Sequence, residues 1–388
     1  DAASGDMIAE RIAIGDRKQW PSLLYADGKI YALTENGRWA ILEITDDGVE
    51  FLNKGRLRDE AFYGSPILAD AKLYFQGTSA LYCVGNETAT QKPVSLAAQL
   101  VGETPTEQHP DSAELLVVPA ELLLQPGESA EISVRLFNAL GQPLATPEAG
   151  AISYEVSGPG SVDGATFTAN SDAAHEAATI TASVGDVSGS TRVRIVPPLP
   201  WKFTFDDLTD PPLSWVGARY RHQIRTVDGS QALVKVSTIP KGARSRAWMG
   251  SSELSNYTIS ADVRAERNGD QMPDIGLTAG GYALDLMGNS QQLQIRCWAA
   301  ELRMAETIDF PWEPNRWYRM KLRAQIEGSG ENAVAVLQGK VWVRGEDEPE
   351  EWTITAQDDS PVLSASPGLY GNAKVAEFAI DNLEVTEN

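Results

Sequence analysis

Apolar and polar residues alternate in short runs along almost the whole chain, and helical periodicity is almost absent. Residues 132–137 and 191–196 are clear examples of a period of two, which is the spacing of a strand with one buried face. The runs are separated by turn-forming residues, because the chain contains 33 Gly and 22 Pro. This pattern predicts an all-β protein built from sandwiches, barrels or propellers.

The first part of the chain contains an internal near-repeat. Residues 20–33 align with residues 64–75, and in both copies a strand ends at an Asp turn and is followed by a strand with a Tyr, at Tyr31 and Tyr74. The offset is about 43 residues, and a period of about 40–45 residues with four short strands is typical of a propeller blade. Residues 1–86 are therefore predicted to form about two blades.

The Ala-Asp-Gly-x-Ile-Tyr turn at residues 26–31 resembles the repeats of pyrroloquinoline-quinone-type β-propellers. A closed propeller has at least about four blades, so the resemblance implies that further blades of a longer chain lie upstream. Two blades cannot enclose the central funnel in which a quinoprotein holds its cofactor. Pyrroloquinoline quinone is therefore not expected to bind this chain.

Two further modules follow the repeat. Residues 87–112 are polar and contain Pro, which predicts a linker. Residues 113–196 hold about seven short strands and no cysteine, and they resemble the bacterial immunoglobulin-like modules of surface proteins. A stiff proline spacer at 197–200 leads into residues 201–388, which contain too many strands for an immunoglobulin-like domain.

The last module is predicted to be a jelly roll, a concanavalin-like sandwich. It resembles the laminin-G and concanavalin A-like lectin/glucanase domains of large secreted bacterial proteins, and the segments that carry this resemblance are 316–322, 339–343, 368–371 and 380–382. The resemblance implies a carbohydrate ligand, such as a polysaccharide or a cell-surface glycan. It carries no catalytic signature, and a fold alone does not define a function.

The charge of the chain excludes several classes of partner. With 32 Lys and Arg against 54 Asp and Glu the formal net charge is −22, so nucleic acid is not an expected partner. The longest apolar runs are far shorter than the roughly 20 residues of a membrane span. The sequence begins at Asp1 without Met, and we expect that a leader has been removed or that the N-terminus has been cut. The expected location is secreted, periplasmic or on the bacterial cell surface.

Motifs for enzymatic chemistry are missing from the sequence. There is no Glu-x-Asp-x-x-Glu run of the glucanases, no Gly-x-Ser-x-Gly elbow and no His-Glu-x-x-His helix. The three histidines are isolated, and Cys83 and Cys297 are too far apart in sequence for a metal-binding pair. Both cysteines are interpreted as small buried residues on strands. The sequence therefore favours a protein without catalytic activity.

A candidate glycan site lies in the jelly roll. By alternation Gln294, Arg296 and Trp298 share one face of a strand, and Tyr282 and Asp285 lie on the preceding strand. Sugar rings stack on aromatic side chains while polar neighbours bind the hydroxyl groups. The alternative interpretation is an ordinary solvent-facing strand with a Trp at its end.

A structural calcium ion is a second possibility for the jelly roll. Asp206 and Asp207 follow its first strand and Asp381 lies in its last strand, and calcium prefers such oxygen ligands. The alternative is a set of turn aspartates. The apolar parity also changes after Ile380, which indicates either a bulge at 381–382 or a strand that is buried on both faces.

These observations predict a non-catalytic extracellular binding or adhesion protein whose jelly roll binds carbohydrate. Two alternatives stay open. The chain could be the targeting part of a larger propeller enzyme, either a quinoprotein oxidoreductase or a glycan-active hydrolase, or it could be a pure surface scaffold.

Overall fold

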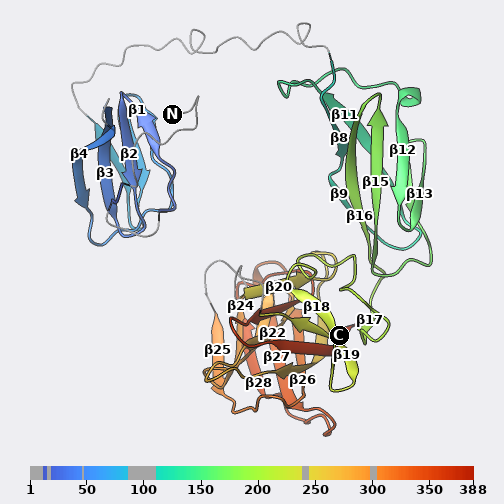
Figure 1. The fold of residues 1–388 in the computed structure, drawn as a ribbon. Coiled ribbons are helices and arrows are strands. Elements are labelled where there is room, and N and C mark those ends of the chain that lie inside the picture. The colour runs from blue at the N-terminus through green and yellow to red at the C-terminus, as the bar shows by residue number, and fades with distance from the viewer. Residues whose placement is uncertain (1–11, 15–18, 46–47, 86–110, 238–243, 298–303) are drawn as a thin grey trace. The chain divides into compact units, whose positions relative to one another are not determined.

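The computed structural model describes residues 12–14, 19–45, 48–85, 111–237, 244–297 and 304–388 (Figure 1). Apart from two short 3-10 turns at Ala149–Ala151 and Gly330–Asn332, the regular elements in these ranges are strands, which confirms the all-β fold class. None of the described residues belongs to a helix with the length and apolarity of a membrane span. The chain forms two compact units, Asp1–Glu103 and Thr104–Asn388.

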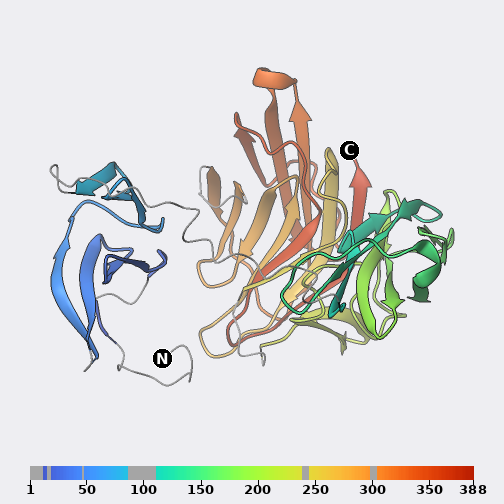
Figure 2. The same cartoon turned by 90° about the horizontal axis from the view of Figure 1, so that it is seen from above.

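The first unit contains two antiparallel sheets that follow each other in sequence (Figure 2). The first sheet has the order β1 (Leu24–Ala26), β2 (Lys29–Leu33), β3 (Arg38–Thr45) and β4 (Gly48–Arg56). The second has the order β5 (Ile67–Ala69), β6 (Lys72–Gln76) and β7 (Leu81–Gly85). Asp27 and Asp70 occupy the same left-handed turn position, each with φ of 50°. The repeat is therefore present as matching hairpins, whereas the propeller-blade interpretation stays a prediction.

The two sheets of the first unit pack through apolar side chains, and Leu33 of β2 is buried in one cluster with Phe62 and Phe75. Phe62 and Phe75 meet edge to face with ring centres 5.5 Å apart, and the Phe75 ring stacks on Tyr82 at 5.1 Å. A cavity of about 370 Å³ between the sheets is lined by Trp39 and other apolar residues of both copies. One expectation for this unit is wrong, because Cys83 is exposed. Its strand lies at the edge of the smaller sheet, and no strand in the described part of the chain lies beyond it.

Residues 111–196 form smaller sheets, antiparallel except for one strand pair, around a separate apolar core. The four-stranded sheet has the order β12 (Ser153–Ser157), β15 (Glu176–Val184), β16 (Val187–Ile195) and β9 (Glu121–Leu124), in which β16 and β9 are parallel. The others are β10 (Ser129–Glu131), β14 (Thr166–Ala169) and β13 (Gly160–Asp163), and the pair β11 (Ser133–Phe137) and β8 (Glu114–Val118). Phe167, Ile180 and Val193 are completely buried in this core.

Residues 201–388 form two larger sheets. The eight-stranded sheet has the order β18 (His222–Val227), β19 (Ser230–Lys235), β30 (Phe378–Glu387), β21 (Tyr257–Ala265), β26 (Tyr318–Glu327), β27 (Val334–Val343) and β28 (Ile354–Asp358), with β17 (Trp201–Phe203) also paired to β30. The six-stranded sheet has the order β20 (Arg244–Trp248), β29 (Gly368–Asn372), β22 (Asp274–Ala279), β23 (Tyr282–Met287), β24 (Gln292–Cys297) and β25 (Ala305–Asp309).

One apolar core joins these two sheets, and alternation along the strands decides which residues enter it. On β21 the side chains of Ile259 and Val263 are fully buried in the core, whereas Asp262 belongs to the opposite parity. On β24 Ile295 and Cys297 are buried in the same core, as predicted for Cys297. The side chains of opposite parity lie on the outer faces, where Asp285, Gln294 and Arg296 belong to the six-stranded sheet. On the outer face of the eight-stranded sheet a smaller apolar cluster contains Ala232, Val234 and Ala379.

The predicted irregularity in the last strand is a bulge. Ser260 pairs with Glu384 and Asp262 pairs with Asp381, so β30 has one residue more than β21 between these pairs. Asn382 adopts a left-handed φ of 46° at this point. The extra residue explains why the apolar parity of the strand changes, because a bulge moves the following side chains to the other face.

Candidate functional site

The outer face of the six-stranded sheet carries an ion pair between two of the predicted residues. Gln294 is directly opposite Asp285, and Arg296 lies two residues further along the same face. The Arg296 Nε donates to Asp285 Oδ2 at 2.7 Å. Asp285 is only 4% exposed, so the carboxylate fixes the guanidinium from below. The Gln294 Nε2 donates to Thr307 Oγ1 on β25 at 2.9 Å.

Three residues that the sequence analysis did not single out complete this face. Tyr370 and Asn372 come from β29, and Asp274 comes from β22. The Asn372 Nδ2 donates to Asp274 Oδ2 at 3.3 Å. The Arg296 guanidinium lies 5.3 Å from the centre of the Tyr370 ring, a cation–π distance. The three segments are far apart in the sequence and meet only because β29 pairs with β22 and β22 pairs with β23.

A glycine makes room for this arrangement. Gly276 is directly opposite both Asp285 and Tyr370. A Cβ atom at Gly276 would lie 2.4 Å from Asp285 Oδ1 and 3.0 Å from Tyr370 Cδ1, which is closer than packed atoms allow. The carboxyl group and the ring therefore lean over β22 where a side chain is missing. The Oδ1 atom of Asp285 is buried there without a hydrogen-bond partner.

Burial changes the protonation of this face. It raises the pKa of Asp285 to about 6, although the nearby Arg296 charge acts in the opposite direction. Burial also raises the pKa of Asp274, while hydrogen bonds from the Gly288 N–H and from Asn372 lower it. The negative charge of Asp274 raises the pKa of Asp285 further. The face therefore holds a carboxyl group that titrates in mildly acidic solution, which is a property common at functional sites.

Tyr282, another predicted glycan residue, is not on this face. Tyr282 is fully buried, and its hydroxyl donates to Asp358 Oδ2 at 2.7 Å in the core. It precedes Asp285 by three positions on one strand, so the two side chains point to opposite sides. Trp298 lies outside the described residues. Of the five predicted glycan ligands, the structure thus brings together Asp285, Gln294 and Arg296.

The predicted calcium ligands lie on the other sheet and in the loop after β17. Asp206 Oδ1 accepts a hydrogen bond from Ser230 Oγ at 3.1 Å, and Asp207 is exposed. Asp381 is 2% exposed and has Arg344 as its ion-pair partner. Within the described ranges no three carboxylate, histidine or cysteine side chains are arranged to hold a metal ion. Calcium binding stays a prediction without a visible ligand set.

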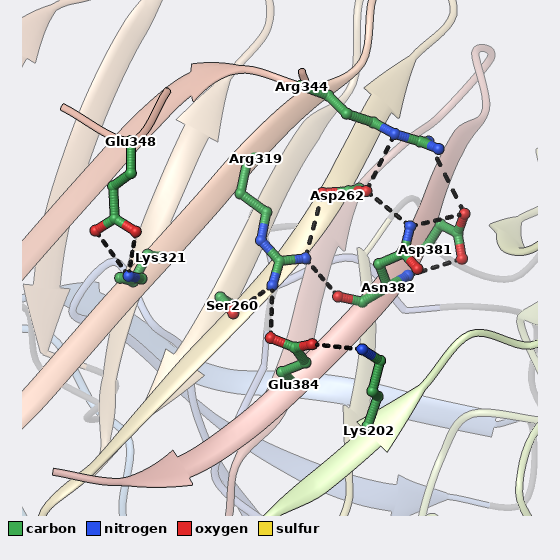
Figure 3. Close-up of polar contacts among 10 residues, drawn as sticks. All are labelled: Lys202, Ser260, Asp262, Arg319, Lys321, Arg344, Glu348, Asp381, Asn382 and Glu384. Atoms are coloured by element: carbon green, nitrogen blue, oxygen red, sulfur yellow. Dashed lines mark hydrogen bonds and ion pairs between the residues drawn. The ribbon is translucent and has the colours of Figure 1, made fainter. Parts of the chain in front are cut away.

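Asp381 instead belongs to a network of charges on the outer face of the eight-stranded sheet (Figure 3). The Arg319 guanidinium donates to Asp262 Oδ1 at 3.2 Å, to Ser260 Oγ at 2.8 Å and to Glu384 Oε2 at 3.0 Å. The Arg344 Nε lies 3.3 Å from Asp262 Oδ2. These contacts join β21, β26 and β30 around the bulge, so the network has a structural role.

Comparisons with known proteins give only distant similarities. No protein-family model matches the chain, and no curated protein matches it. A β-1,3-glucanase from Mycobacterium marinum is 13% identical over 48% of this chain and 97% of the glucanase, with a TM-score of 0.31. A structure from work on endo-acting O-glycanases of the human gut microbiota is 10% identical over 48% and 98% of the two chains, with a TM-score of 0.34. Similarity at this level does not establish what this chain does.

Proposed function

We propose that residues 201–388 are a non-catalytic carbohydrate-binding module that binds glycan on the outer face of the six-stranded sheet. The observation that carries this proposal is the Arg296–Asp285 pair, in which a buried carboxylate and the Tyr370 ring fix a partly exposed guanidinium. A planar donor that is already fixed binds hydroxyl groups without a further loss of side-chain freedom. Gln294 and Asn372 lie on either side of the pair and add amide donors and acceptors.

The rest of the chain fits the role of an extracellular carrier for this module. We assign residues 1–86 to two propeller-like repeats, 87–112 to a linker, 113–196 to an immunoglobulin-like sandwich and 197–200 to a proline spacer before the jelly roll at 201–388. An acidic chain with a net charge of −22 stays soluble and avoids polyanions. We propose that the protein acts outside the cell, where polysaccharides and cell-surface glycans are available as ligands.

The test is a glycan array followed by calorimetric titration of the full chain. Weak single-site binding, with a Kd of about 1 μM to 1 mM, is expected for a shallow polar face. Gln294→Ala and Arg296→Ala are expected to weaken binding at least roughly tenfold, equal to about 1.4 kcal/mol. Gln357→Ala is the matched control, because Gln357 is an exposed amide on a strand of the other sheet. The proposal fails if no glycan binds, or if Gln294→Ala and Arg296→Ala bind as tightly as Gln357→Ala.

One observation also favours an acid–base role for the same face. Asp285 has a pKa of about 6 beside a second carboxyl group, Asp274, and paired carboxyl groups of different pKa carry out glycoside hydrolysis in other proteins. The measurement is release of reducing ends from the bound glycan between pH 4 and pH 8. Hydrolysis that disappears in Asp285→Asn, while binding is retained, would support this second function. Binding without hydrolysis would leave the module non-catalytic.

A further inference from the structure

Among the described residues, the second sheet of the first unit ends in a strand that is paired on one side only. In the first sheet β2 and β3 form the central hairpin and β4 pairs with the far side of β3. In the second sheet β6 and β7 form the equivalent hairpin, but no described residue pairs with the far side of β7. The first copy of the repeat thus shows that this edge accepts an antiparallel strand.

This edge lacks the features that keep other edges from pairing. The edge strand β4 carries the charges of Glu50, Lys54 and Arg56 and a register shift opposite Ile41–Leu42, and β1 and β5 are only 3 residues long. By contrast β7 reads Leu-Tyr-Cys-Val-Gly, pairs regularly with β6 over its 5 residues, and has no charge and no proline. Edges without these features are templates for pairing with another chain.

The edge is also apolar on both sides of the sheet. Leu81 is 70% exposed and Val84 is 54% exposed, and they differ by three positions, so they point to opposite faces. Large exposed apolar side chains on one short strand are typical of an interaction surface. Pairing along the edge would cover both of them and would satisfy the outward N–H and C=O groups of the strand.

We infer that β7 pairs with β7 of a second copy of this protein, antiparallel and about a twofold axis at Cys83. When a strand pairs antiparallel with its own copy, the twofold axis passes either through one residue or between two neighbouring residues. An axis at Cys83 pairs all 5 residues of β7. Leu81 then lies opposite Gly85 of the second copy, and Tyr82 lies opposite Val84. The two three-stranded sheets become one continuous six-stranded sheet. An interface of this kind is isologous and closes at the dimer.

The exposed thiol reports this geometry directly. In the twofold arrangement the two Cys83 residues face each other, and directly opposed residues of antiparallel strands have Cα atoms about 4.5–5.5 Å apart. This distance lies within the range of about 4.4–6.8 Å that a disulfide requires. With a small disulfide such as oxidised glutathione, one Cys83 thiolate forms a mixed disulfide and releases one reduced thiol. The second Cys83 thiolate then displaces the other reduced thiol and leaves a Cys83–Cys83 bond.

Analytical ultracentrifugation of the full chain in a reducing buffer tests the interface without the disulfide. We expect a reversible monomer–dimer equilibrium, and Cys83→Ser should keep it. Cys83→Lys and Cys83→Asp should each be monomeric, because the axis brings two like charges directly opposite each other. An equimolar mixture of Cys83→Lys and Cys83→Asp should dimerise again. Circular dichroism of each variant checks that the sheets are intact.

Oxidation gives an independent readout. With oxidised glutathione the native protein should form a dimer linked at Cys83, identified by mass spectrometry, while Cys297 stays unlinked because it is 1% exposed. Cys83→Ser/Glu50→Cys is the matched control, since it moves the exposed thiol to β4 and should cross-link far more slowly. The inference is overturned if the protein is monomeric at all concentrations. It is also overturned if Cys83→Lys dimerises like the native protein, or if the mixed charge variants stay monomeric.

Discussion

Asp285 accepts a hydrogen bond from Arg296 at 2.7 Å through Oδ2, yet its Oδ1 atom is buried without a partner. A carboxylate that is only half satisfied in a buried position is costly, because water cannot replace the missing donor. The arrangement is therefore poor for stability but presents a fixed guanidinium on the outer face of the sheet.

The first prediction concerns the pH dependence of stability. The pKa of Asp285 is about 6 in the folded protein, against its usual value of 3.8. Between pH 3.8 and pH 6 the Asp285 carboxyl group binds a proton more tightly in the folded state than in the unfolded state. The contribution of Asp285 to the free energy of unfolding therefore falls as pH rises through this range. The free energy of unfolding of the native protein minus that of Asp285→Asn should therefore decrease from pH 4 to pH 6, by up to about 3 kcal/mol.

The comparison with Asp285→Asn is needed because two histidines act in the opposite direction. Burial lowers the pKa of His175 and of His222 to about 4, so their contributions rise with pH between about 4 and 6.5. Both histidines are present in the two proteins, so their contributions cancel when the free energy of unfolding of one is subtracted from that of the other. Urea denaturation at each pH measures both free energies. A difference that does not change with pH would show that Asp285 titrates normally.

The second prediction concerns Gly276, which leaves the space for Asp285 and Tyr370. Gly276→Ala adds a Cβ atom 2.4 Å from Asp285 Oδ1, so the carboxyl group has to move. We expect a loss of stability of about 1–3 kcal/mol, the usual cost of overpacking, together with weaker glycan binding. Gly150→Ala is the control, because no atom lies within 4 Å of the added Cβ there. Equal stabilities of the two variants, measured by chemical denaturation, would contradict this role of Gly276.

The fold class and the core were predictable from the sequence, because alternation is a local signal. It assigns Ile295 and Cys297 to the core and Gln294 and Arg296 to the outer face of the same strand, and the burial of these residues agrees. The parity change after Ile380 likewise indicated either a bulge at 381–382 or a strand that is buried on both faces, and the structure has the bulge. In each case the evidence lies within one strand and does not depend on the rest of the fold.

The composition of the candidate site was not predictable in the same way. Asp274, Gly276 and Tyr370 reach Asp285 only through the order of strands in the sheet, and a single sequence does not contain this order. Tyr282 lies three positions from Asp285 on the same strand, so its side chain enters the core and not the candidate site. The exposure of Cys83 was not predictable for a related reason, since the place of β7 at the edge of the described sheet also depends on the order of the strands.

The third prediction concerns Glu60, which holds the hairpin that presents β7. Its carboxylate accepts hydrogen bonds from Ser79, from Tyr82 Oη at 2.7 Å and from Thr78 Oγ1 at 3.1 Å. The hydrogen bonds from Ser79 and Tyr82 lower the pKa of Glu60 to about 2. Since the folded pKa lies below the usual 4.5, the stability gained from Glu60 is present above pH 4.5 and is lost as pH falls towards 2.

Glu60→Gln should therefore remove the acid-dependent part of this stability. We expect faster hydrogen exchange of the β7 amides in Glu60→Gln than in the native protein at neutral pH, and a smaller difference near pH 3. Glu50→Gln changes an exposed carboxylate on β4 and should leave the exchange of β7 unchanged. Equal protection of β7 in Glu60→Gln and Glu50→Gln would mean that the hairpin does not depend on Glu60.

The last prediction separates the buried and exposed parts of the charge network. Arg319→Ala removes the hydrogen bond to Oδ1 of Asp262, which is 5% exposed. Breaking a buried ion pair lowers the free energy of unfolding by about 3–5 kcal/mol. Lys202→Ala removes a pair with Glu384 in which the lysine side chain is 66% exposed, so its expected cost is below about 1 kcal/mol. Thermal and urea denaturation of both variants measure the difference. If Arg319→Ala were as stable as Lys202→Ala, the contacts around the Asn382 bulge would not be what joins β21, β26 and β30, and the apolar core alone would hold these strands together.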